Sequence, residues 1–82
     1  IINEQLLAEH LPELTTTELL VAKAILMKLQ LSEMITMTGK SKGNITTIRS
    51  RIRRKLKLAP TDQFYNSLFL RVFGTQPRSM KM

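Results

Sequence analysis

Positive charge is concentrated in one short stretch of this 82-residue chain, and small polar side chains lie within the same stretch. Eight of the thirteen lysines and arginines fall between residues 40 and 57, with no acidic residue among them. Dense cations attract a polyanion, while hydroxyl and amide groups can form hydrogen bonds with the edges of nucleic-acid bases. The stretch therefore predicts a nucleic-acid-binding surface. A solvated basic surface that serves only solubility is the alternative.

The remainder of the chain offers few residues for other chemistry. Residues 1–39 carry a net charge of −3, whereas residues 40–82 carry +10. His10 is the single histidine and there is no cysteine, so neither a metal site nor a catalytic set is expected. The sequence therefore predicts a binding protein that is not an enzyme and needs no cofactor. The absence of cysteine fits a reducing, cytoplasmic setting. Because no apolar run approaches the roughly 18 residues of a membrane helix, no membrane partner is expected.

Apolar residues recur at helical spacing and sustained strand-like alternation is absent, which predicts an all-α fold of four or five helices. A short lead-in helix is expected over 2–10, and the segment 1–13 is expected to be this lead-in helix or a linker from a larger parent protein. The domain itself is predicted over 14–74, followed by a flexible tail over 75–82. Its helices are expected at 16–29, 32–38 and 41–57, with a last helix from Thr61 or Asp62 to Gly74.

Local signals support this division into helices. Thr15 can cap the 16–29 helix, with Glu18 three residues later as its capping-box partner. Gly39 ends the short 32–38 helix, because glycine tolerates the left-handed conformation, and Ser41 can cap the next helix. A short helix, a three-residue turn and a longer basic helix form the layout of a helix-turn-helix.

The 41–57 helix has two opposed faces. Its apolar face is formed by Ile45, Ile48, Ile52 and Leu56. The opposite face carries small polar residues in its first half, where a helix can lie deep in the DNA major groove, about 12 Å wide. The residues predicted to face bases are Thr46, Thr47 and Ser50. The residues predicted to bind phosphates are Lys40, Ser41, Lys42, Asn44, Arg51, Arg53, Arg54 and Lys57. Residues 42–57 are thus the predicted recognition helix for double-stranded DNA.

Residues 14–58 resemble the LuxR/GerE-type helix-turn-helix, found at the C-terminus of many bacterial response regulators and related transcription factors. The resemblance runs without a gap over about half of the chain. It is carried by Leu14-Thr15-x-x-Glu18, Leu31-Ser32-Glu33-Met34-Ile35, Ser41-x-x-x-Ile45, Ile48, Ile52 and Lys55-Leu56-x-Leu58. It implies a four-helix domain that binds DNA as the output domain of a transcription regulator. The third helix would enter the major groove, and the last helix would support dimerisation.

Carried over by position, the resemblance implies that Thr46, Thr47 and Ser50 face the bases. It also implies that Ser41, Asn44 and Arg54 contact the DNA backbone. The chain departs from the family at three places. Lys57 replaces a glycine that commonly follows the Lys-Leu pair, and Met37-Thr38 replaces a bulky apolar residue of the short helix. Base-facing positions that often hold Lys or Arg hold Thr and Ser here, so weaker direct readout is expected.

Two other functions fit part of the pattern. The stretch from Ile48 to Leu56 also resembles region 4 of sigma factors, which reads promoter DNA while docking on RNA polymerase. A basic amphipathic helix can alternatively bind a protein or an anionic membrane surface, although the apolar face of 41–57 is needed for the core. The aromatic residues of the last helix are expected to fill the core, with a homodimer contact as the alternative; they are Phe64, Phe69 and Phe73.

Overall fold

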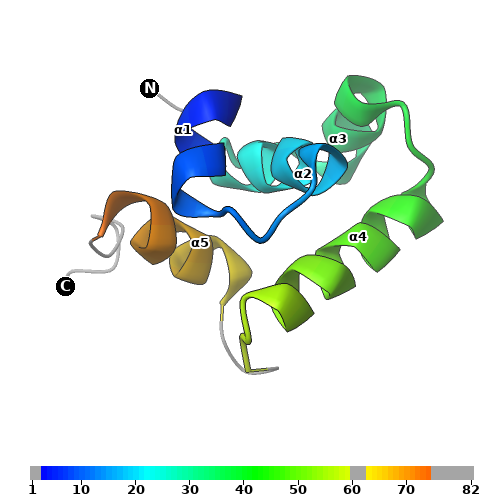
Figure 1. Ribbon diagram of the computed structural model, residues 1–82. Helices are drawn as coiled ribbons and strands as arrows, with labels where there is room; N and C mark the ends of the chain where they lie inside the picture. Colours follow the sequence, from blue (N-terminus) through cyan, green and yellow to red (C-terminus); the bar gives the residue numbers. More distant parts are fainter. Residues whose placement is uncertain (1–2, 60–62, 75–82) are drawn as a thin grey trace, which may run out of the picture.

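The part of the chain that the structure describes, residues 3–59 and 63–74 of a computed structural model, contains five α-helices and no strands (Figure 1). They are α1 (Glu4–His10), α2 (Thr16–Leu26), α3 (Leu31–Thr38), α4 (Lys42–Lys55) and α5 (Phe64–Phe73). The predicted all-α fold of four or five helices is confirmed. The tail predicted over 75–82 and the helix start predicted at Thr61 or Asp62 lie outside the described residues.

Helix α2 lies at the centre of the fold and contacts each of the other four helices. In Figure 1 it runs through the middle of the molecule, with α3 and α4 on one side and α1 and α5 on the other. Its side chains are buried around most of the helix, and two of them, Ala22 and Ala24, are small enough to let neighbouring helices approach closely. Each of the other helices therefore takes its position from α2.

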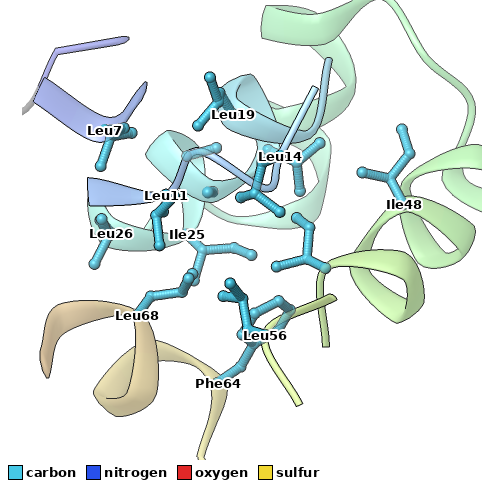
Figure 2. Packing of buried hydrophobic residues seen from close by; sticks show 14 of the residues in the cluster. Leu7, Leu11, Leu14, Leu19, Ile25, Leu26, Ile48, Leu56, Phe64 and Leu68 are labelled. Atoms are coloured by element: carbon cyan, nitrogen blue, oxygen red, sulfur yellow. The ribbon is translucent and has the colours of Figure 1, made fainter. Parts of the chain in front are cut away.

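The hydrophobic core joins the N-terminal segment to the last helix. Leu7 of α1 and Leu11 after it are fully buried, so the predicted lead-in segment packs into the same core as the remaining helices. Figure 2 shows these two leucines near Ile25 of α2, with Leu68 and Phe64 of α5 on the other side of it. Burial of apolar side chains of this size stabilises the fold by about 1.5–3 kcal/mol each.

The predicted signals at helix starts and at the turn are confirmed. Thr15 Oγ1 accepts a hydrogen bond from the Glu18 N–H at 3.3 Å, and Glu18 Oε1 accepts one from the Thr15 N–H at 2.8 Å. This exchange is the capping box. Gly39 ends α3 with a left-handed φ of 70°. Ser41 Oγ accepts a hydrogen bond from the Asn44 N–H at 3.2 Å and thereby caps α4.

Two helices end earlier than predicted. Helix α2 ends at Leu26 rather than residue 29, and α4 ends at Lys55 rather than residue 57. In each case a lysine two residues later, Lys28 or Lys57, adopts a left-handed φ of 58°. The leucine that follows donates its N–H to a carbonyl five residues earlier, which is the pattern of a Schellman helix end. Because this end is usually built with glycine, the lysines themselves do not mark it in the sequence.

An ion pair between the buried Glu18 and the exposed Lys55 joins the start of α2 to the end of α4. Glu18 is only 3% exposed, and its Oε1 accepts a hydrogen bond from Lys55 Nζ at 2.7 Å. Burial raises the pKa of the Glu18 carboxyl, but hydrogen bonds from the Lys55 ammonium and the Thr15 N–H outweigh burial and hold the pKa below its ordinary value. The carboxylate is therefore ionised at neutral pH and holds α4 against α2.

Replacing Lys57 by glycine is expected to stabilise the fold by about 1 kcal/mol, because glycine adopts a positive φ without the steric cost that lysine bears. Urea denaturation followed by circular dichroism measures this change. Lys57→Ala removes the same charge but keeps the unfavourable φ, so it should give no comparable gain. A lower stability of Lys57→Gly than of wild type would contradict the prediction.

Lys55→Met should lower the free energy of unfolding by about 2 kcal/mol at neutral pH, because it leaves the Glu18 carboxylate buried without its partner. The folded pKa of Glu18 lies below its ordinary value of 4.5, so the stabilisation by the ion pair is complete above that pH. It is lost as the pH falls through the folded pKa, so the difference between the two proteins should shrink in acid. Denaturation at a series of pH values tests both points.

The matched control for this variant is Arg54→Met. Arg54 is exposed on the same turn of α4, and no ion pair involves it in the described part of the chain. Its replacement should change stability by no more than about 0.5 kcal/mol. Equal losses in the two variants, or a difference that does not depend on pH, would show that the pair with Glu18 does not stabilise the fold.

Candidate nucleic-acid interface

Helix α4 turns one face to the core and leaves the other in solvent. Ile45, Ile48 and Ile52 are buried, as the predicted apolar face requires. Figure 1 shows α4 at the edge of the molecule, joined to α3 by the turn that contains Gly39 and Ser41. A short helix, a tight turn and a longer helix with an exposed outer face form the arrangement of a helix-turn-helix.

The three residues predicted to face bases lie together on the exposed side of α4. Thr46, Thr47 and Ser50 are exposed, and Gly43 lies one turn before Thr46. Spacings of three and four residues place these positions on one side of the helix. The Thr46 hydroxyl donates a hydrogen bond to the Lys42 carbonyl oxygen at 3.1 Å. Because all the side chains here are small, another molecule can come close to the helix backbone.

Most of the residues predicted to bind phosphates surround Thr46, Thr47 and Ser50. Exposed residues among them are Ser41, Lys42, Asn44, Arg51, Arg54 and Lys57, whereas Lys40 is half-buried. In residues 3–59 and 63–74, ion pairs join Glu4 to Lys23, Glu18 to Lys55 and Glu13 to Arg71. None of these pairs includes a lysine or arginine of the surrounding set. The outer face of α4 therefore presents positive charge that carboxylates of the described chain do not neutralise.

Arg53 lies elsewhere than the phosphate-binding prediction requires. It is half-buried between α4 and α5, with its guanidinium carbon 4.8 Å from the centre of the Phe64 ring. Its Nη1 also donates a hydrogen bond to the Ala59 carbonyl oxygen at 3.3 Å. Arg49 lies over the same ring at 5.4 Å. Because Phe64 arrives from a distant part of the sequence, spacing along α4 could not separate Arg53 from the exposed cations beside it.

A surface pocket of about 310 Å³ lies where the start of α2 meets α4. Residues of α2, the turn and α4 line it: Thr15, Thr17, Glu18, Lys40, Asn44, Thr47, Ile48 and Arg51. Two cations, three hydroxyl groups and an amide there can bind an anionic group such as a phosphodiester. The Glu18 carboxylate also borders the pocket, but its charge is offset by Lys55. Sequence analysis missed Thr17, since only the crossing of α2 and α4 brings it to this site.

Most of the exposed carboxylates among the described residues lie on or beside α1, and Glu33 of α3 is the exception. Glu4 and Glu9 are exposed on α1, which Figure 1 places across α2 from α4. Arg71 of α5 donates to both carboxylate oxygens of Glu13, at 3.2 and 3.0 Å. A backbone hydrogen bond and the Arg71 contact lower the pKa of Glu13. This distribution of charge favours one orientation of the domain towards a polyanion, with α4 in front.

No set of three or more histidine, aspartate or glutamate side chains in the described residues could hold a metal ion, and no helix there is long and apolar enough to cross a membrane. No known protein family, curated protein or solved structure matches this chain. The inference of function therefore depends on the geometry and charge of α4 and of the pocket beside it.

Arg53→Ala should lower the free energy of unfolding by about 1 kcal/mol, because the variant loses the contact with the Phe64 ring and the hydrogen bond to Ala59. Arg54→Ala, one residue further on and exposed, should change it by no more than about 0.5 kcal/mol. Urea denaturation of both variants at one salt concentration makes the comparison. A loss in Arg54→Ala as large as that in Arg53→Ala would contradict the division between the two arginines.

Proposed function

We propose that this chain is a double-stranded-DNA-binding domain of the LuxR/GerE type, acting as the output domain of a bacterial transcription regulator. Helix α4 is its recognition helix and enters the major groove, with Thr46, Thr47 and Ser50 towards the bases. The observation that carries the proposal is the outer face of α4, where small polar side chains are flanked by cations that have no carboxylate partner in the described chain.

The dimensions of α4 support this assignment. At 1.5 Å per residue its 14 residues extend about 21 Å, and an α-helix with its side chains fits the major groove of about 12 Å. Its first half carries small residues at positions that would lie deepest in the groove. Its second half carries Arg51 and Arg54, the preceding turn carries Lys40, and Lys57 lies just after its end. These longer side chains can reach phosphates on either side of the groove.

The pocket beside α4 supplies a place for one of those phosphates. Lys40 and Arg51 provide positive charge, and Asn44 and Thr17 provide hydrogen-bond donors. The start of α2 faces the same pocket, and the partial positive charge of a helix N-terminus favours an anion. In the proposed complex a backbone phosphate bound here fixes the rotation of α4 in the groove, so that the same residues always meet the bases.

A second copy of the domain would pack through α5. Leu70 and Phe73 are 43% and 38% exposed on this helix, and Phe69 is half-buried beside Phe73, with their ring centres 4.6 Å apart. Phe64 is buried in the core and is not available for such a contact, so the predicted aromatic set divides between two roles. The resulting dimer would bind two half-sites on the same DNA.

Titration of a fluorescent random-sequence duplex, followed by anisotropy at increasing salt, tests the proposed function. The logarithm of affinity should fall linearly with the logarithm of salt, with a slope of about −4 to −6, since each phosphate contact contributes about −0.9. An Arg51→Ala/Arg54→Ala double variant should bind more weakly and have a slope smaller in magnitude by about 2.

The control is Lys28→Ala/Arg71→Ala, which removes the same charge at positions outside α4 and the turn. Its slope should match that of wild type, and circular dichroism should confirm that both double variants are folded. Absence of binding at low salt would overturn the proposal. Equal losses in the two double variants would show that net charge, and not α4, determines the binding.

A further inference from the structure

We infer that Thr46 selects thymine, by placing its γ-methyl group against the C5-methyl group of a thymine in the major groove. This inference rests on the proposed function, and names the base that one position of α4 recognises. It depends on the hydrogen bond of the Thr46 hydroxyl and on the small residues that lie around Thr46 on the outer face of α4.

The hydroxyl of Thr46 is engaged within its own helix. Its Oγ1 donates to the Lys42 carbonyl oxygen at 3.1 Å, and a threonine hydroxyl has only one proton to donate. The acceptors that bases present in the major groove are N7 and O6 of guanine, N7 of adenine and O4 of thymine. With its proton engaged, Thr46 offers these acceptors no hydrogen-bond donor. Its Oγ1 can still accept a hydrogen bond, and its γ-methyl group is the apolar group that the exposed side chain adds to the surface.

The positions around Thr46 leave that methyl group accessible. Gly43 precedes it by one turn without a side chain, and a Cβ atom built at Gly43 would meet no atom within 4 Å. Ser50 follows it by one turn and is also small and exposed. Thr47, the other threonine of this face, also lines the pocket with Lys40 and Arg51, so it lies between the base-facing positions and the proposed phosphate site. Thr46 is therefore the residue that presents an apolar group between the flanking cations.

Thymine is the natural partner for such a group. Among the four DNA bases it alone carries a methyl group in the major groove, and contact between this group and a threonine methyl group is a recognised mode of base discrimination. Burying one methyl-sized group away from water strengthens binding about fourfold. The preference at this position is therefore modest but specific to one atom of one base.

The experiment begins with a duplex that the wild-type domain selects from a random-sequence library. Each thymine of that duplex is then replaced in turn by deoxyuridine, which lacks only the C5-methyl group. At one thymine in each half-site, the replacement should weaken binding of the wild-type domain about fourfold. The salt dependence of binding should stay the same, because no phosphate contact changes.

Two variants separate the methyl group from the hydroxyl group. Thr46→Ser keeps the hydroxyl and removes the methyl, so it should bind the thymine duplex about fourfold more weakly and no longer distinguish it from the deoxyuridine duplex. Thr46→Val keeps the methyl position and removes the hydroxyl, so it should still distinguish the two duplexes.

The inference would be overturned if the two variants showed the opposite pattern. It would also be overturned if Thr46→Ser were as sensitive as the wild type to every deoxyuridine replacement. In that case salt-dependent binding that still needs Arg51 and Arg54 would leave the proposed function standing. If the wild-type domain binds no duplex at low salt, both the proposed function and this inference fail. The two failures are therefore distinguishable from a single set of titrations.

Discussion

The carboxylate of Glu18 accepts hydrogen bonds from two directions, from the Thr15 N–H at the start of α2 and from Lys55 Nζ at the end of α4. It therefore caps one helix and anchors another with the same group. Both contacts are made by Oε1, and they stabilise the ionised form of a carboxylate that is buried in the protein. Because α2 contacts all four other helices, this pair also fixes α4 relative to the rest of the core and sets the spacing of the pocket walls.

The start of α4 is unfavourable for an isolated helix. Its first turn has no acidic residue, and Lys40 and Lys42 lie beside an N-terminus whose partial charge is already positive. Ser41 caps the helix, and burial of one isoleucine face against α2 supplies the stability that the charges remove. A local arrangement that opposes the fold is typical of a functional site. Here an external anion would relieve it, which is why the charge on α4 supports a polyanionic partner.

Signals confined to a few neighbouring residues predicted most of the fold. The capping box of Thr15, the left-handed end at Gly39 and the apolar face of α4 all follow from spacing along one helix. The early ends of α2 and α4 were missed because Lys28 and Lys57 adopt a conformation that the sequence marks only with glycine. At position 57 the glycine of the resembled family was an available signal. In the candidate site, the exposed positions Thr46, Thr47 and Ser50 were predicted. The pocket and the packing of Arg53 against Phe64 depend on contacts between distant segments, which spacing along one helix does not reveal.

The composition of the outer face limits what one domain can discriminate. In the proposed complex its cations would contact phosphates, which every duplex presents, so this part of the affinity would carry no sequence information. Its base-facing residues are threonine and serine, and none of them offers the bidentate contact worth about 1–3 kcal/mol that arginine or asparagine makes. If the proposed function holds, a single copy of the domain would therefore bind its own site only slightly more tightly than random DNA. Two linked copies combine the discrimination of two half-sites, which gives the exposed Leu70 and Phe73 of α5 a physical reason to be apolar.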